Sequence, residues 1–138
     1  MKENKIEFKE ITVPLPVGSK AVNTLYYVVD NGRSDVIENL DKLDKTALNI
    51  TKRLFAHMII YDECKSKKVQ YRLRKHQYGE IKPMPHRFFF FRKFGNHIIF
   101  FDYRKKKSKS LGEEVYSLIE TKMRKYEQAF ERYRKKGK

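Results

Sequence analysis

Hydrophobic and polar positions alternate near the start of the chain in a way that predicts two strands. Residues 6–13, IEFKEITV, alternate weakly and end at the prolines of PLPVG, a pattern typical of an edge strand. Residues 25–30, LYYVVD, are more strongly apolar and run into DNG, a turn signal. The first thirty residues are therefore expected to contribute two short strands.

A helical periodicity follows. Ser34 is a suitable helix N-cap, and the apolar positions after it recur at alternating steps of four and three. These positions are Val36, Leu40, Leu43, Ala47, Ile50 and Leu54. Because the polar stretch 41–46, DKLDKT, can hold a turn, the pattern predicts either one helix or a helical hairpin that ends near 61–68.

A period of two returns in the middle third. Residues 69–75, VQYRLRK, alternate strictly, so the arginines of this stretch share one face. After the loop HQYGEIKPMP, residues 86–93 and 97–104 predict two strands joined by a short hairpin through FGN. Both are apolar on both faces at their centres, as in the middle of a covered sheet, and the run 88–91, FFFF, is expected to be core.

The last thirty residues predict one long amphipathic helix. Ser110 and Glu113 match an S-x-x-E capping box at its start. Its buried side, ending near residue 134, is marked by Val115, Leu118, Ile119, Met123, Tyr126, Phe130 and Tyr133. The element order predicts an α+β fold, an antiparallel sheet with helices packed on it, and 138 residues suit one domain, 1–138.

Charge is distributed unevenly along the chain. The formal net charge of +15 divides into −1 for residues 1–64, +13 for 65–109 and +3 for 110–138. The basic segment is also the one richest in aromatic and β-branched residues, so its cations are expected to decorate a sheet. A net charge of this size bears on binding partners and not on the fold, and it predicts a polyanionic ligand.

Several kinds of chemistry lack their sequence signals. The chain has no Gly-rich phosphate loop, C-x-x-C, H-E-x-x-H or G-x-S-x-G, and its four histidines lack zinc-site spacing, so no metal and no cofactor are expected. Cys64 is the single cysteine, which suits a reducing compartment. The first residues have no apolar signal region, and no apolar run is long enough to cross a bilayer, so a cytoplasmic protein without a membrane partner is expected.

The cations of the basic segment are expected to gather at one rim of the sheet. In an antiparallel hairpin the start of strand 86–93 lies opposite the end of strand 97–104, which makes Arg87 a neighbour of residues 103–106. The arginines of 69–75 join them if that strand pairs alongside. Guanidinium and ammonium groups beside aromatic rings suit a phosphodiester. Two histidines of this region, His76 and His86, fit either ordinary loop positions or a catalytic role.

Three motifs in this region carry a family resemblance. The stretches YRLR (71–74), HR (86–87) and YRKKKSK (103–109) resemble the RelE/ParE superfamily of bacterial toxin–antitoxin toxins, especially its phage-derived HigB-like branch. The resemblance covers about residues 25–133, and residues 1–24 look like an added N-terminal segment. It implies a twisted antiparallel sheet with an N-terminal helix or helical hairpin and a C-terminal helix packed on it.

The resemblance also implies an activity and partners. Members of this superfamily are often endoribonucleases that cleave mRNA on the ribosome without a metal. A 2′-hydroxyl attacks the neighbouring phosphate and leaves a 2′,3′-cyclic phosphate and a 5′-hydroxyl. The implied partners are mRNA, the ribosome and a cognate antitoxin with a helix-turn-helix domain.

Residue roles follow from the same motifs. The family's arginines fall on Arg74 and Arg87, which would hold and stabilise the scissile phosphate. Lys105 or Lys106 would act as a base or as electrostatic support, and Tyr103 or His76 would assist proton transfer or stacking. The remaining cations expected to bind RNA are Arg72, Arg104, Lys107 and Lys109. The chain departs from the branch's pattern at Phe101, where a histidine is common, and at Lys107 and Leu111, in place of a threonine and a proline.

Two other functions share these features. The gyrase-inhibiting branch of the superfamily binds a protein and cleaves nothing, and a plain basic nucleic-acid-binding module needs no catalytic groups. The density of cations favours the nuclease, because the gyrase-inhibiting branch generally lacks this compact basic set.

Overall fold

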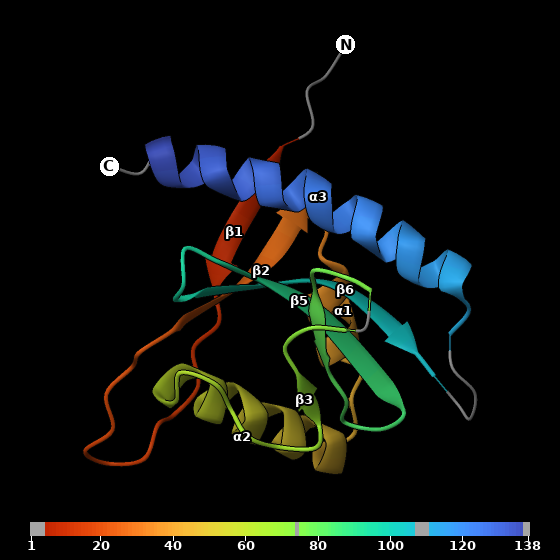
Figure 1. Ribbon diagram of the computed structural model, residues 1–138. Coiled ribbons are helices and arrows are strands. Elements are labelled where there is room, and N and C mark those ends of the chain that lie inside the picture. The colour runs from red at the N-terminus through yellow and green to blue at the C-terminus, as the bar shows by residue number, and fades with distance from the viewer. Residues whose placement is uncertain (1–4, 74, 107–110, 137–138) are drawn as a thin grey trace.

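The computed structural model describes residues 5–73, 75–106 and 111–136, and these form a six-stranded sheet with helices on both faces (Figure 1). The strands are β1 (Ile6–Glu10), β2 (Thr24–Asp30), β3 (Val69–Gln70), β4 (Gly79–Ile81), β5 (His86–Lys93) and β6 (His97–Lys105). The helices are α1 (Asp35–Leu40), α2 (Lys45–Ile60) and α3 (Glu113–Lys136). None of the helices in this part of the chain is long and apolar enough to cross a membrane. The predicted α+β class is confirmed.

The sheet is mixed, with strand order β1-β2-β6-β5-β4-β3. Four neighbouring pairs are antiparallel, but β2 and β6 are parallel, from Thr24 opposite His97 to Tyr27 opposite Phe100. The predicted wholly antiparallel sheet is therefore wrong at this pair. The chain leaves β2 through α1 and α2 and returns only with its last strand, and such a long crossover permits parallel pairing.

One core fills the space between the sheet and α2. Phe88 and Phe90 of β5 and Phe100 of β6 are fully buried there, against Phe55 and Met58 of α2. The side of the sheet to which these residues point is called the α2 face below. The polar stretch after α1 does hold a turn, because α2 begins anew with Asp44, whose carboxylate accepts a hydrogen bond from the Ala47 amide. The helical hairpin, rather than one rod, is the correct alternative.

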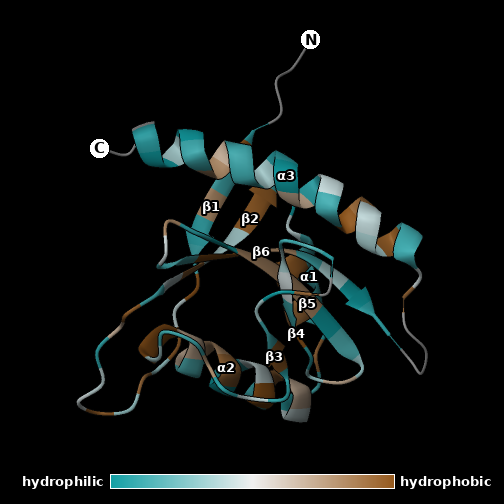
Figure 2. Cartoon of the chain, viewed as in Figure 1, coloured by the Kyte–Doolittle hydropathy of each residue, from teal (hydrophilic) through white to brown (hydrophobic). Residues whose placement is uncertain are grey.

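A second core fills the space between the sheet and α3. Phe89, Phe91 and Phe101 point to this side, the α3 face, and pack with Ile119 and Phe130 of the helix. Figure 2 shows apolar strands at the centre of the sheet, between α3 and α2. The expectation that the Phe88–Phe91 run is core is confirmed, and alternation sends its members to both layers.

A β-bulge changes the pairing of β5 and β6 halfway along. Phe90 lies opposite Phe100, but Phe89 lies opposite Asp102, so Phe101 is the extra residue. Phe101 and Asp102 consequently both reach the α3 face, where Asp102 accepts a hydrogen bond from Lys122 Nζ of α3 at 2.9 Å. Every residue of β6 after the bulge is shifted by one position relative to β5.

The region around β3 and β4 and the start of α3 differ from the sequence prediction, and β1 ends at Glu10 instead of residue 13. Among the described residues of the expected strand 69–75, only Val69–Gln70 belong to a paired strand, and the expected loop contains β4, which lies between β3 and β5. The chain turns back through Gly79, where an added Cβ would lie 2.6 Å from the Tyr71 carbonyl oxygen, so only glycine fits. At the other end, α3 begins at Glu113, and the predicted capping residue Ser110 lies outside the described residues.

Candidate functional site

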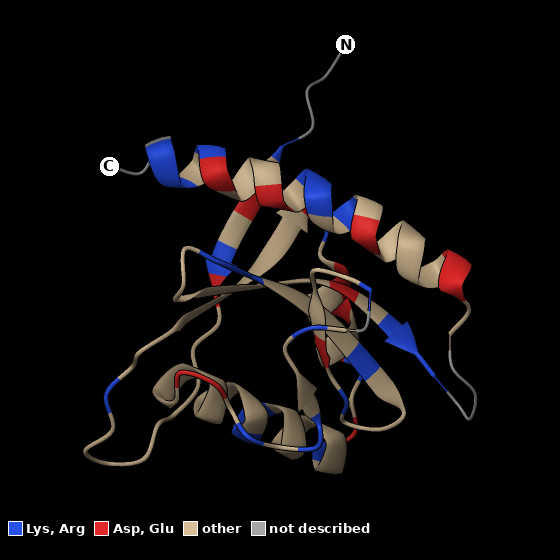
Figure 3. Ribbon diagram, in the orientation of Figure 1, with Lys and Arg blue, Asp and Glu red and all other residues tan. Residues whose placement is uncertain are grey.

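The start of β5 and the end of β6 lie side by side, as the hairpin predicts, and are called the rim here. His86 lies opposite Lys105, Arg87 opposite Arg104 and Phe88 opposite Tyr103. The Lys106 amide donates a hydrogen bond to the Pro85 carbonyl at 2.8 Å, which holds the two chain segments together. Figure 3 shows basic residues on both strands at this end of the sheet.

Three side chains form a group on the α2 side of the rim. The Nδ1 atom of His86 lies 2.6 Å from the hydroxyl oxygen of Tyr103, and the Tyr103 ring packs on Phe88 with ring centroids 4.9 Å apart. Lys105, opposite His86 in the register, is exposed. His86, Tyr103 and Lys105 are called the rim site below. Packing on Phe88 holds the Tyr103 ring in place, and the hydrogen bond to the Tyr103 hydroxyl orients the His86 ring. Lys105 adds a positive charge beside them.

Burial and charge set the protonation of this group. Partial burial lowers the pKa of His86, the charge of Lys105 lowers it further, and Asp44 at the start of α2 opposes them. Burial raises the pKa of the Tyr103 hydroxyl. At neutral pH the rim site therefore holds an unprotonated imidazole beside a protonated phenol and an ammonium group.

The cations on the α3 side of the rim are paired with carboxylates instead. Arg87 is buried, and its Nη1 atom donates to Glu80 Oε2 at 3.2 Å. Arg104 Nε lies 3.4 Å from the buried Asp102, which Lys122 also contacts. These pairs anchor the strands to one another and to α3, and they leave little positive charge to meet a phosphate.

The predicted arginine and lysine do not share one pocket. Cross-strand partners lie on the same face of a sheet, so Lys105 accompanies His86 on the α2 face while Arg87 accompanies Arg104 on the α3 face. The expectation that Arg87 and Lys105 converge is wrong, although their backbones are neighbours. The third predicted member, Arg74, lies outside the described residues.

The remaining predicted residues are dispersed. Both ring nitrogens of His76 contact carboxylates of α3, at 2.6 Å from Glu120 and 3.1 Å from Glu113, so this histidine ties the β3–β4 connection to the helix. Arg72 is exposed in the same connection, which does not pair with β5 as the prediction required. Lys106 is partly buried just past β6, and Lys107 and Lys109 lie outside the described residues.

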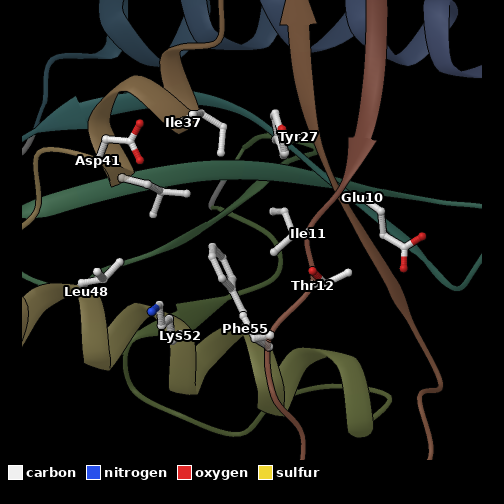
Figure 4. A pocket seen from close by; sticks show the side chains of 11 residues that line it. Glu10, Ile11, Thr12, Tyr27, Ile37, Asp41, Leu48, Lys52 and Phe55 are labelled. Carbon is white, nitrogen blue, oxygen red and sulfur yellow. The ribbon is translucent and has the colours of Figure 1, made fainter.

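A hydrophobic hollow on the α2 face is a weaker candidate. It has a volume of about 490 Å³ and lies between the end of β1, α1 and α2. Figure 4 shows Phe55, Ile11 and Ile37 pointing into it and the Glu10 carboxylate pointing away. Its described lining contains no hydrogen-bonded acid–base pair, so the rim site offers more chemistry. Across residues 5–73, 75–106 and 111–136, no three His, Cys, Asp or Glu side chains gather in a way that could hold a metal ion.

His86 is the residue that sequence reasoning did not assign. The sequence left His86 open between an ordinary loop position and a catalytic role, and the HR motif assigned a role only to Arg87. The signal that could have found it is its position at the first residue of a strand whose partner ends in aromatic and lysine residues. A correct register is needed to use that signal.

The three motifs of the family resemblance occupy different parts of the fold. The first follows β3, the second begins β5, and the third ends β6 and continues beyond the described residues. Comparisons of this chain with protein-family models, curated proteins and solved structures found no match.

Proposed function

We propose that this protein is a metal-independent endoribonuclease whose chemical groups are His86, Tyr103 and Lys105. The observation that carries the proposal is a histidine whose pKa is lowered by burial and by Lys105, held 2.6 Å from a tyrosine hydroxyl and opposite an exposed lysine. A base, a hydrogen-bond donor and a positive charge are what the 2′-hydroxyl attack on a phosphodiester requires. The strongly basic segment 65–109 around them supports an RNA substrate.

His86 is the general base in this scheme. In the tautomer with a proton on Nδ1, that N–H donates to the Tyr103 oxygen and leaves the Nε2 lone pair free. Nε2 takes the proton of the 2′-hydroxyl while O2′ forms its bond to phosphorus. The bond from phosphorus to O5′ then breaks, and the proton passes from the imidazolium to O5′. The products are a 2′,3′-cyclic phosphate and a 5′-hydroxyl.

Tyr103 and Lys105 act on the charge that develops at phosphorus. The raised pKa keeps the Tyr103 hydroxyl protonated, so it can donate to a nonbridging oxygen. Lys105 stabilises the dianionic phosphorane electrostatically, and its charge also keeps His86 unprotonated before the attack. Arg72 and Lys106 are further cations suited to the neighbouring phosphates of the strand.

The biological setting that we propose is a toxin of a type II toxin–antitoxin system in the cytoplasm. The resemblance of the three motifs supports it, as does an exposed cation at the rim that a protein inhibitor could cover. A small neighbouring gene that encodes a helix-turn-helix protein is expected. Co-expression of that protein should restore growth of cells that produce this chain, and failure to do so would contradict the toxin role.

The activity is tested by incubating the purified protein with mRNA in EDTA, with and without ribosomes, and by assaying DNA gyrase in parallel. Cleavage in either mRNA sample supports the nuclease. Binding of mRNA without cleavage would replace it with a nucleic-acid-binding module. Gyrase inhibition without cleavage would replace it with a gyrase-inhibiting toxin.

Lys105→Ala is expected to change the pH dependence of cleavage. The base must be unprotonated, and burial and Lys105 both lower the pKa of His86, so the acidic limb of the wild-type profile should lie below pH 6.5. Removal of the lysine charge raises that pKa, which moves the limb to higher pH and lowers the plateau. Lys45→Ala, an exposed lysine at the start of α2, is the control. An unshifted limb in Lys105→Ala would contradict the assigned coupling.

A further inference from the structure

A polar pocket lies on the α3 face, between the β3–β4 connection and the start of α3. It has a volume of about 450 Å³, and its lining includes Gln70, Lys75, His76, Glu80, Glu113 and Tyr116. Glu113 is exposed at its solvent side, whereas the Glu80 side chain is only 5% exposed. The pocket is separate from the rim site, which lies on the α2 face.

One side chain that lines this pocket, Glu80, and its ion-pair partner behind the lining, Arg87, each have a buried polar atom without a hydrogen-bond partner within the described residues. Glu80 Oε2 accepts from Arg87, but Glu80 Oε1 has no donor, and Arg87 Nε has no acceptor. A buried acceptor or donor left without a partner destabilises the fold, so native proteins rarely keep one without a reason. Since the carboxylate lines the pocket, a ligand that brings an N–H donor would satisfy it.

The charges around the pocket favour a neutral ligand. Glu80 is balanced by Arg87, and His76 lies between Glu113 and Glu120, the latter also paired with Arg124. Lys75 is a further cation in the lining. The carboxylates would repel a phosphate, and the cations would repel a metal ion or an amine. A neutral group with a hydrogen-bond donor beside an acceptor is repelled by neither kind of charge.

Aromatic rings give the pocket a flat surface. The rings of His76 and Tyr116 are stacked at 29° with centroids 5.9 Å apart, and the Tyr78 ring lies 5.1 Å from His76. The Tyr78 hydroxyl donates to the Tyr116 carbonyl at 2.8 Å, which fixes these residues relative to each other. Planar heterocycles stack on such surfaces.

We propose that this pocket binds one unpaired nucleobase of the RNA, with Glu80 accepting a base N–H and Tyr116 offering the stacking surface. Nucleobases are neutral and planar and carry N–H groups that can donate to the unpartnered Glu80 oxygen. The inference rests on the proposed ribonuclease function, because it makes the pocket an element that selects one nucleotide of the bound strand. His86 and Arg87 are consecutive in β5, so a strand crossing the rim can reach both faces.

Binding is tested directly with the four ribonucleosides, which carry no phosphate, followed by amide chemical shifts of residues 79–81 and 116. At least one ribonucleoside is expected to shift these amides, and Glu80→Gln should weaken its binding tenfold or more. Tyr116→Leu should weaken it as well, which keeps the test valid if the first variant does not fold. Glu114→Gln is the matched control, because Glu114 is an exposed carboxylate in the same helical turn as Tyr116, and this variant should bind as the wild type does. The proposal would be overturned if none of the four compounds shifted these amides, or if both pocket variants bound as tightly as the wild type.

Cleavage measurements separate this inference from the proposed function. RNA oligomers that differ in one base at successive positions on either side of the scissile bond should be cleaved at different rates by the wild type at one of these positions, and Glu80→Gln should reduce that difference tenfold or more. Cleavage without base binding would refute the pocket and leave the ribonuclease intact. Base binding without any cleavage would refute the ribonuclease and leave a nucleotide site of unassigned role.

Discussion

His86→Ala is expected to lower the rate of RNA cleavage by about 10²–10⁴-fold, the usual contribution of a general base. The loss follows because no carboxylate or second imidazole of the described rim can replace Nε2 at this position. The measurement is single-turnover cleavage of an RNA oligomer at pH 7, together with thermal unfolding of the variant. Since His86 is only partly buried at the start of its strand, where its ring hydrogen-bonds to the Tyr103 side chain, folding should be retained.

The matched control for this variant is His57→Ala. His57 lies in the last turn of α2, contacts the Tyr61 ring and does not belong to the rim site, so its removal should leave cleavage unchanged. Equal rates for His86→Ala and the wild type would remove His86 from the chemistry. Loss of activity in both variants would point to a general effect of losing a histidine.

Arg87→Ala is expected to lower the free energy of unfolding by about 3–5 kcal/mol, because it leaves the Glu80 carboxylate buried without its partner. Urea denaturation followed by circular dichroism measures this. Arg33→Ala removes an exposed pair with Glu38 and should leave the free energy of unfolding nearly unchanged. The large difference between the two arginines is the signature of a structural ion pair.

A double variant separates this structural role from the role that the sequence motif suggested. Glu80→Leu with Arg87→Met replaces both charges by apolar groups and should recover most of the stability lost in Arg87→Ala. If Arg87 instead binds the scissile phosphate, Arg87→Ala should fold as stably as the wild type and fail to cleave. That outcome would contradict the buried-pair account and favour the family-derived assignment.

The parts of the fold that short-range pattern dictates were predictable from the sequence. The β5–β6 hairpin follows from FGN between two apolar runs, and the edge strand β1 from weak alternation that ends at prolines. The break between α1 and α2 was one of two alternatives, and the Asp44 cap decides it. The parallel β2–β6 pair depends on where the chain returns after a long crossover, which local pattern does not encode.

The β-bulge explains why the site was only partly predictable. Counting back from the hairpin without a bulge places Arg87 opposite Tyr103, on the face of Lys105, whereas the observed register places it opposite Arg104. One extra residue at Phe101 thus exchanges Arg87 for His86 in the rim site. Tyr103 and Lys105 could be selected from the motif, but the histidine that completes the group depends on a packing detail in the middle of the sheet.

A single 2′-deoxy substitution at the cleaved nucleotide of an RNA oligomer tests the central claim most directly. With the unmodified oligomer in EDTA, the wild-type protein should yield a 2′,3′-cyclic phosphate and a 5′-hydroxyl, as mass spectrometry can identify. The deoxy oligomer should stay intact at that bond, and His86→Ala should leave both oligomers intact. Cleavage of the deoxy oligomer at the same bond, or a 3′-hydroxyl with a 5′-phosphate as products, would contradict the account.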